Sequence, residues 1–383
     1  MTLTVLVLAA LTASSFGLSA WQFGLALRFP LHRRGAVGGP WPDVSILKPL
    51  KGCDAETRDC LRSWFRQDYA GRVELLLGVQ SQEDAAFDMA RATIAEHPGV
   101  AAQLVVCGRR LGPNGKVSTL AQLALQARHE VVCASDADMQ VTADFLANVV
   151  EPLRDPDVGL VNCFYRLSNP ANFAMRWEAF AVNADFWSQV LQSVALKPMD
   201  FALGAVIVTP RGRLDAIGGF EALVDYLADD YELGRRIASQ RAEVALCTVV
   251  ADCRTAPMDF GEVWRHQLRW GRTIRVCQPG PYFLSILGNA TLWPLLLLVA
   301  RHSTAVLVAA GMALAGRMIQ GFLLERRMQR HGSVDSFWLA PVKDLLQIAI
   351  WAASFAGRDV VWRGERFRVG ADGKLSKATS RRR

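Results

Sequence analysis

The sequence predicts an α/β fold with α-helical membrane segments at both ends of the chain, and two observations support this prediction. Short aliphatic runs alternate with segments of helical spacing between about residues 43 and 280. Long stretches of low charge occupy the N-terminus and the region that follows Pro279. Because such alternation implies crossover connections, we expect a mostly parallel sheet with helices on both faces.

The individual elements of the α/β region follow from run length and periodicity. Short aliphatic runs of strand-like length are expected to be strands at 44–50, 73–79, 103–107 and 131–134. The segments between them carry apolar residues at helical spacing, which predicts helices at 55–65, 84–96 and 116–127. Later runs predict further strands at 159–163, 205–208 and 244–250.

The N-terminal segment has the composition of a membrane anchor. Residues 3–27 contain no acidic or basic side chain, and Arg28, Arg33 and Arg34 follow them. This length is sufficient to cross a bilayer, and the positive flank predicts that the following residues lie in the cytosol. Without a basic n-region or a clear cleavage site, an uncleaved anchor is favoured over a signal peptide.

Three apolar segments follow Pro279, at 282–300, 303–324 and 337–355. The second contains Arg317, and the third contains Lys343 and Asp344, although charges inside a membrane span are costly. Four crossings would also leave the basic C-terminal tail outside, against the positive-inside tendency. We therefore expect one of the C-terminal segments, preferably the last, to be re-entrant or interfacial.

These patterns give a domain organisation. They predict a transmembrane anchor at 1–28, a cytosolic α/β domain at 29–280, two or three membrane segments at 281–357 and a basic cytosolic tail at 358–383. The formal net charge is +7, and Lys and Arg concentrate near the apolar segments and in the tail. Attraction to lipid headgroups explains this placement better than nucleic-acid binding, which requires a basic stripe with interleaved aromatics.

Two carboxylates, Asp136 and Asp138, follow the expected strand at 131–134. In an open α/β sheet, ligands bind outside the carboxyl ends of the strands. Two acids at this position can hold Mg²⁺ or Mn²⁺ against a diphosphate, because these cations prefer hard oxygen ligands. A solvated turn is the alternative explanation of an Asp-x-Asp pattern taken alone.

Further acidic residues stand before predicted helices. Asp84 follows the expected strand at 73–79, and Asp229 and Asp230 precede a helix expected at 232–239. Each can cap its helix, because acids favour the first turn. In a functional interpretation, Asp84 accepts hydrogen bonds from a nucleobase imide. Mutual repulsion between Asp229 and Asp230 then raises one pKa and makes that carboxylate a usable base.

A basic and aromatic segment at 264–272 carries the last motif. On a helix, His266, Arg269 and Trp270 share one face. Arg269 can pair with a diphosphate through its planar guanidinium, and Trp270 can cover a sugar or a lipid. A juxtamembrane amphipathic helix explains the same pattern, and the two interpretations are compatible.

In this order and at these separations, the motifs resemble the ceramide glucosyltransferase family, glycosyltransferase family 21, which includes bacterial hopanoid biosynthesis-associated enzymes. The resemblance covers nearly the whole chain, including 45–52, 112–117, 361–364 and 367–369. It implies a GT-A (Rossmann-like) nucleotide-sugar glycosyltransferase domain between the membrane segments. Asp84, Asp136 and Asp230 match its three aspartate motifs. Arg269 and Trp270 match the end of (Q/R)-x-x-R-W, where His266 replaces the Gln or Arg.

The resemblance also implies a reaction. A membrane-bound, inverting lipid hexosyltransferase would move a sugar from a UDP-sugar to a lipid hydroxyl, with UDP-glucose and ceramide as the expected pair. Transfer of N-acetylglucosamine to a bacteriohopane polyol is the alternative, and a non-catalytic membrane scaffold is less favoured. The expected location is a bacterial inner membrane, with several crossings and a cytoplasmic catalytic domain.

Site roles follow from the matched motifs. Asp230, Arg269 and Trp270 are expected to be catalytic, and Asp136 and Asp138 are expected to hold Mg²⁺ or Mn²⁺. The family motif supports Asp136, whereas Asp138 is included on coordination chemistry alone. The expected substrate-binding residues are Asp84, Lys51, Asn114, Lys116, Asp229 and His266.

Overall fold

The computed structural model describes residues 2–35, 38, 40–329, 336–362 and 364–377. The chain forms two compact units, each assembled from segments that are separate in the sequence. Unit 1 contains 1–30, 170–197 and 257–372, and unit 2 contains 31–169, 198–256 and 373–383. Within the expected C-terminal region, Arg363 and the tail residues Arg381, Arg382 and Arg383 lie outside the described residues.

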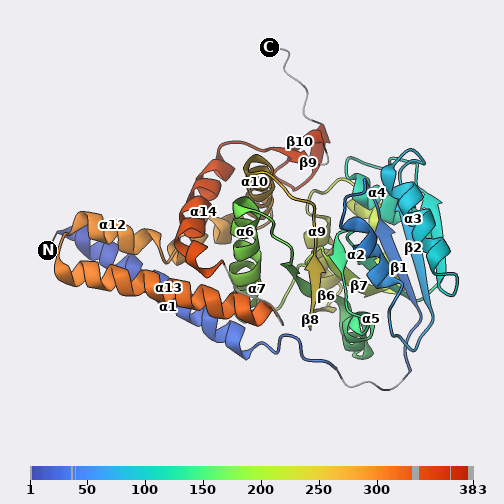
Figure 1. Cartoon of the computed structure of the whole chain (residues 1–383), viewed down its shortest axis with the longest axis horizontal. Coiled ribbons are helices and arrows are strands. Elements are labelled where there is room, and N and C mark those ends of the chain that lie inside the picture. The colour runs from blue at the N-terminus through green and yellow to red at the C-terminus, as the bar shows by residue number, and fades with distance from the viewer. Residues whose placement is uncertain (1, 36–37, 39, 330–335, 363, 378–383) are drawn as a thin grey trace, which may run out of the picture. The chain divides into compact units, whose positions relative to one another are not determined.

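Unit 2 is built around an eight-stranded mixed sheet in the order β3-β2-β1-β4-β7-β6-β8-β5 (Figure 1). The strands are β1 (Val44–Pro49), β2 (Val73–Val79), β3 (Ala101–Val106), β4 (Val131–Ser135), β5 (Met139–Gln140), β6 (Val158–Leu167), β7 (Val206–Pro210) and β8 (Glu243–Cys253). The first four strands are parallel, as expected. The antiparallel strand β7 then joins β4 to β6, so the strands that follow make the sheet mixed.

Helices cover both faces of this sheet. On one face, α2 (Thr57–Trp64), α3 (Ala85–Glu96) and α5 (Phe145–Val150) share one apolar core with alternate strand residues such as Val44 and Ile46. On the other face, α4 (Gly115–Gln126) packs directly on β2. A Cβ built at Gly78 would lie 2.6 Å from Thr119 Cγ2, so glycine permits this close approach. Because successive side chains of a strand point to opposite faces of the sheet, each side chain of a buried strand contacts the helices of one face only.

The remaining elements of unit 2 lie between or after the strands of this sheet in the sequence. They are η1 (Glu151–Arg154), α8 (Arg211–Ala216), η3 (Phe220–Leu223), α9 (Asp229–Ser239) and β11 (Leu375–Lys377). The expected helices at 55–65, 84–96 and 116–127 are confirmed as α2, α3 and α4, with ends that differ by one or two residues.

Unit 1 is mainly helical. It contains α1 (Leu3–Arg28), α6 (Phe173–Phe180), the π-helical η2 (Ala181–Phe186), α7 (Trp187–Leu196), α10 (Phe260–Cys277), α11 (Pro279–Leu284), η4 (Ser285–Gly288), α12 (Leu292–Ala300), α13 (Thr304–Met328), η5 (Phe337–Leu339) and α14 (Ala340–Phe355). The strands β9 (Asp359–Trp362) and β10 (Glu365–Val369) form an antiparallel pair.

Two described helices, α1 and α13, are long and apolar enough to cross a membrane. The apolar segment at 282–300 is not one continuous helix, because α11–η4 and α12 meet at 54°. Asn289 accounts for this break, since its Oδ1 accepts hydrogen bonds from the N–H groups of Thr291 and Leu292 and so starts a new helix. The bent segment, a broken span or a re-entrant loop, therefore precedes α13. We expected the re-entrant or interfacial segment to be preferably the last apolar one, at 337–355. That segment contains α14, a helix of 16 residues.

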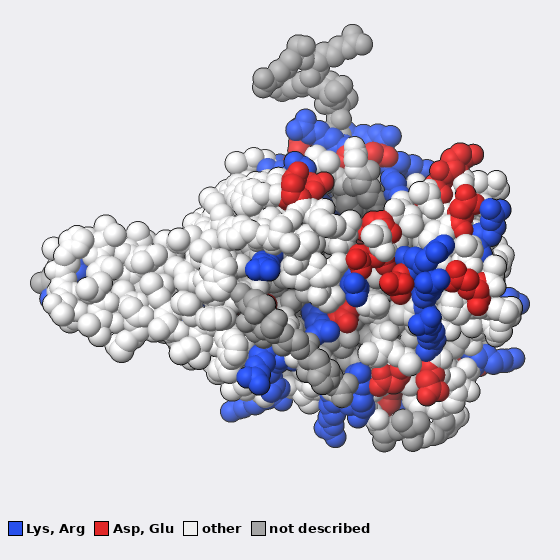
Figure 2. Space-filling view, in the orientation of Figure 1, with Lys and Arg blue, Asp and Glu red and all other residues white. Residues whose placement is uncertain are grey.

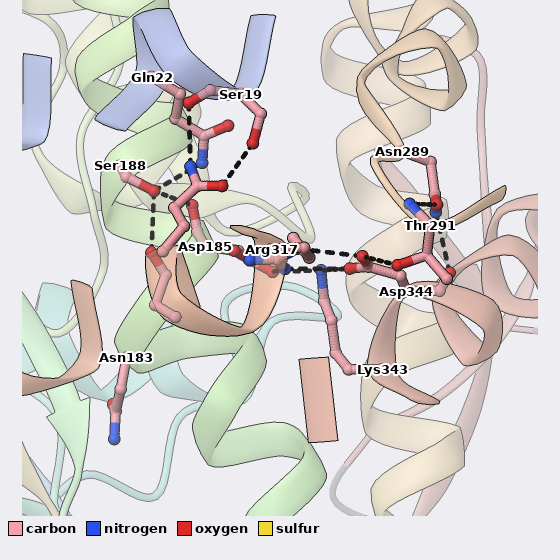
Figure 3. Close-up of polar contacts among 12 residues, drawn as sticks. Ser19, Gln22, Asn183, Asp185, Ser188, Asn289, Thr291, Arg317, Lys343 and Asp344 are labelled. Carbon is pink, nitrogen blue, oxygen red and sulfur yellow. Dashed lines mark hydrogen bonds and ion pairs between the residues drawn. The ribbon is translucent and has the colours of Figure 1, made fainter. Parts of the chain in front are cut away.

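The charges inside the apolar segments of unit 1 are paired with one another (Figure 3). Arg317 of α13 donates from Nη2 to Asp185 of η2 at 2.7 Å and to Asp344 of α14 at 3.0 Å. Lys343 contacts the same two carboxylates, and Thr291 donates its hydroxyl to Asp344 at 2.6 Å. The four ionic side chains are each at most 7% exposed, so two cations and two anions form a neutral buried cluster.

Neutral polar side chains add contacts to α1 in the same unit. Ser19 donates its hydroxyl to Gln320 of α13, and Gln22 donates to Ser188 of α7 at 2.6 Å (Figure 3). Hydrogen bonds of this kind hold helices together where the surroundings are apolar on all sides. The charged residues of these segments, each of which would be costly alone in an apolar environment, therefore help to join the helices through their contacts with one another.

Replacing Arg317 with methionine tests the importance of the buried cluster. The substitution leaves the carboxylates of Asp185 and Asp344 with one cation between them, so we expect unfolding to become easier by about 3 kcal/mol or more. The measurement is chemical denaturation of the purified protein in detergent. Arg326→Met, at an exposed arginine of the same helix, serves as the control. Equal stability of the two variants would contradict the predicted role of the cluster.

Candidate functional site

The candidate site of unit 2 lies where β4 ends and Asp136 begins. The Asp136 N–H donates to the carbonyl of Ala205 at 3.0 Å, which fixes the segment before β7 beside this turn. The Asp136 side chain remains one-third exposed. The strand thus delivers a carboxylate to the sheet edge where open α/β sheets bind their ligands.

Lys116, at the start of α4, joins two acidic elements. Its Nζ lies 2.5 Å from Asp136 Oδ1 and 3.9 Å from Asp229 Oδ2, and the lysine side chain is 13% exposed. Burial disfavours the charged lysine, but the neighbouring carboxylates outweigh burial and raise the pKa of Lys116. The lysine therefore stays cationic and holds the end of β4 close to the start of α9.

Asn114 positions this lysine. Its Oδ1 accepts a hydrogen bond from the Val117 N–H at 3.0 Å, which caps the start of α4. Its Nδ2 donates to the carbonyl of Tyr226 at 2.9 Å and to Asp229 Oδ1 at 3.2 Å. One amide side chain thus orients both the helix that carries Lys116 and the loop that leads to α9.

Asp230 is the carboxylate with the most distinctive environment. Burial, with a contribution from adjacent Asp229, raises the pKa of Asp230 to about 6. The Tyr231 N–H donates to Asp230 Oδ1 at 2.8 Å, and Gly204 leaves room for the other oxygen. A Cβ built at Gly204 would lie 2.7 Å from Asp230 Oδ2. A carboxylate with a pKa near 6 can both accept and release a proton close to neutral pH.

Asp138 and Lys48 lie beneath the turn that follows β4. Lys48 of β1 is fully buried, donates to Ser135 Oγ at 3.1 Å and to the Asp136 carbonyl, and lies 4.9 Å from the Trp64 ring centroid. Burial lowers the pKa of Lys48 to about 8. Burial, together with repulsion from Asp136, raises the pKa of Asp138. Asp138 Oδ2 accepts a hydrogen bond from Cys253 at 3.5 Å.

Asp136 and Asp138 are the carboxylates of this region that could hold a divalent cation. Asp138 Oδ1 is buried without a hydrogen-bond partner in the described part of the chain, and Asp136 offers a second, partly exposed carboxylate. Within the same residues, no group of three or more His, Cys, Asp or Glu side chains is arranged to hold a metal. Because Mg²⁺ sites often use one or two carboxylates plus substrate phosphates, two protein ligands are consistent with such a site.

Two further predicted substrate-binding residues of unit 2, Asp84 and Lys51, lie in or beside the loop that follows β1. Asp84 caps α3, since its Oδ1 accepts hydrogen bonds from the N–H groups of Ala86 and Gly52. The helix-cap interpretation of Asp84 is therefore confirmed, and the Gly52 contact ties the loop after β1 to the start of α3. Lys51 is exposed in that same loop.

The remaining predicted residues belong to α10 of unit 1. His266 Nδ1 lies 2.6 Å from the buried carboxylate of Glu178, which also accepts a hydrogen bond from Gln267 at 2.9 Å. The ring of Trp270 lies 4.8 Å from that of His266 and 6.2 Å from that of Phe186. Arg269 lines a cavity in this unit together with Arg265 and Arg272. The His266–Trp270 contact agrees with the predicted shared helix face.

Sequence reasoning missed two residues of the site. Lys48 had a usable signal, because a lysine in an otherwise apolar strand that is buried on both faces requires a charged partner. Gly204 had no such signal in the sequence, because its importance depends on the approach of Asp230 from the distant helix α9.

Comparison with known proteins identifies relatives over most of the chain. The family model described as Glycosyl transferase family 21 matches residues 2–375. Ceramide glucosyltransferase 1 of Caenorhabditis elegans is 24% identical over 243 residues, which cover 63% of this chain and 52% of that protein. Beta-monoglucosyldiacylglycerol synthase of Trichormus variabilis is 25% identical over 64% of this chain and 52% of its own length. The chain thus aligns with about half the length of these relatives.

A solved structure supports the fold. The mannosyltransferase PcManGT of Pyrobaculum calidifontis, determined in complex with GDP-Man and Mn²⁺, superimposes with a TM-score of 0.55 at 22% identity. The superposition covers 92% of this chain and 98% of that one. The expected GT-A fold is therefore confirmed.

Replacing Asp230 with asparagine tests the burial of its carboxylate, because the substitution should change the free energy of unfolding in a way that depends on pH. A folded-state pKa above the unfolded value of 3.8 favours folding while the group is protonated, and this contribution is lost as the pH rises through about 6. We therefore expect Asp230→Asn to stabilise the protein at pH 7.5 by on the order of 1–3 kcal/mol, and to be nearly neutral at pH 4.

Thermal unfolding at the two pH values measures this difference. Asp215→Asn is the matched control, because that carboxylate is exposed and its loss should give no such gain. A lower melting temperature for Asp230→Asn at pH 7.5 would contradict the account.

Proposed function

Because the chain belongs to glycosyl transferase family 21, we propose that it transfers glucose from UDP-glucose to the hydroxyl of ceramide. Family membership makes it a glycosyltransferase, and relatives named for ceramide and diacylglycerol acceptors support a lipid substrate. The observation that carries the proposal is the cluster of Asp136, Lys116, Asp229 and Asp230 at the end of β4.

Asp230 is the proposed general base. Its raised pKa means that the ionised carboxylate binds a proton readily at neutral pH, which suits removal of a proton from an attacking hydroxyl. The lipid oxygen would attack the anomeric carbon from the face opposite the UDP, in a single inverting displacement. Gly204 has no side chain that would crowd Asp230 Oδ2, so a larger residue at this position would displace the proposed base.

The proposed donor contacts surround this base. Lys116 supplies a fixed positive charge near the position where the diphosphate gains negative charge, with Asn114 and Asp229 holding the lysine in place. Asp136 and Asp138 would hold Mg²⁺ or Mn²⁺, which neutralises the departing diphosphate when bound. Asp84 and Lys51 are proposed to contact the nucleoside from the loop that Gly52 ties to α3.

Arg269, Trp270 and His266 are proposed to act in the same reaction because of the motif that they match. Arg269 would pair with phosphate oxygens and Trp270 would contact the sugar or the lipid. The contact between His266 and Glu178 supports a positioning role for the histidine, which would orient Trp270. A lipid acceptor also agrees with the apolar helices α1 and α13, and we propose a multi-pass protein of a bacterial inner membrane with a cytoplasmic active site.

The direct test is product formation by the purified protein. We expect UDP release and a glycolipid product with UDP-glucose and ceramide in mixed micelles containing Mn²⁺, and loss of both with EDTA. UDP-N-acetylglucosamine with a bacteriohopane polyol and UDP-glucose with diacylglycerol form the comparison arms. Turnover confined to either comparison arm would overturn the proposed substrates, whereas full activity in EDTA would overturn the metal role of Asp136 and Asp138.

The pH dependence tests Asp230 as the base. Because the carboxylate must be ionised to accept a proton, kcat/KM should be low at pH 5, rise through about pH 6 and level off above pH 7. Asp230→Asn should lower kcat/KM about 10²–10⁴-fold. Asp215→Asn, at an exposed carboxylate of unit 2, should leave it unchanged. A rising limb that persists in Asp230→Asn at the same midpoint would contradict this assignment.

A further inference from the structure

A cavity of about 590 Å³ in unit 1 is lined largely by arginines. It is formed by α10 and by the segment that runs from Ala356 into β10. The arginines of its lining are Arg265, Arg269, Arg272, Arg358, Arg366 and Arg368. Figure 2 shows basic side chains gathered over the region where Figure 1 labels β9 and β10.

The positive charge of this cavity is poorly balanced by its own lining. Asp359 is the single acidic residue among those that line it, and its carboxylate lies 3.1 Å from Arg368 Nε and 3.9 Å from Arg366 Nε. Arg272 donates a hydrogen bond from Nη1 to the Asp359 carbonyl, while its Nε is buried without a hydrogen-bond partner in the described residues. Burial, followed by repulsion from Arg275, lowers the pKa of Arg272. An anion in this cavity would relieve that repulsion.

The walls of the cavity continue directly into the apolar part of unit 1. The helix α14 ends at Phe355, next to Ala356 of the lining, and α10 is followed at once by α11. The rings of Tyr282, Phe283, Trp351 and Phe355 form a contiguous aromatic cluster with centroid distances of 5.0–6.3 Å. Two of these rings are exposed, Phe283 at 56% and Phe355 at 42%. Exposed aromatic rings at the ends of apolar helices are typical of the membrane–water interface.

We propose that this cavity binds the phosphate-bearing headgroup of an anionic membrane phospholipid. Arginine matches phosphate oxygens with two parallel hydrogen bonds, and clusters of basic residues beside membrane segments attract anionic lipids. Leu268, Val360 and Val361 add apolar surface for the carbons next to the phosphate. A soluble phosphate or nucleotide is also negatively charged but makes no use of the neighbouring aromatic cluster. The cavity shares Arg269 with the proposed transferase reaction, so its test substitutes lining arginines that have no assigned role in that reaction.

Native mass spectrometry of the full-length protein in nonionic detergent tests this site. Phosphatidylglycerol and phosphatidylcholine of equal chain length are titrated separately, and the retained lipid is counted. We expect at least tenfold tighter binding of phosphatidylglycerol, and at least a tenfold loss of that binding in the double variant Arg358→Gln/Arg366→Gln. Both substituted side chains are exposed, so the variant should unfold at the same temperature as the parent protein.

The matched control is Arg28→Gln/Arg326→Gln, which removes two exposed arginines of the same unit that do not line the cavity. This control should bind phosphatidylglycerol as the parent protein does. Equal losses in the two double variants, or equal binding of the two lipids, would overturn the site. Displacement of phosphatidylglycerol by millimolar inorganic phosphate would also overturn the proposal, because the cavity would then be a site for soluble phosphates.

Discussion

The candidate site depends on the interaction of one buried cation, Lys116, with two carboxylates that come from different elements. Asp136 belongs to the end of a sheet strand and Asp229 to the first turn of α9, and without a shared counter-ion their charges would repel. The positive charge of Lys116 lowers the pKa of Asp230, but burial and Asp229 keep that pKa well above that of an exposed aspartate. The geometry of the acidic cluster therefore follows from where α4 begins, which Asn114 determines as its cap.

Unit 1 also contains buried charges that are compensated by side chains from other elements. Arg317, Lys343, Asp185 and Asp344 are each costly in an apolar environment, yet together they are neutral and hydrogen-bonded. The arrangement requires residues from three elements, including the π-helical segment that carries Asp185. In both units, a lysine or arginine that looks isolated in the sequence is placed by carboxylates far away along the chain.

The sequence predicted the first half of the fold well because its strands are short apolar runs that alternate with amphipathic helices. The carboxylates at the end of β4 and the start of α9 were found for the same reason, since motifs at element ends can be located from element order. The break at Asn289, the space that Gly204 leaves for Asp230 and the pairing of Arg317 were not predictable. The break depends on a local helix cap inside an otherwise apolar run, whereas the other two depend on which distant side chain approaches in three dimensions.

The central claim is a single displacement at the sugar with Asp230 as the base, and the stereochemistry of the product tests it most directly. UDP-glucose has an α-linked sugar, so one inverting displacement must give a β-linked glycolipid. The anomeric configuration is measured by the proton coupling constant of the purified product in an NMR spectrum, after a reaction short enough to exclude secondary transfer. A β-linkage is the predicted result, and an α-linked product would contradict the proposed role of Asp230.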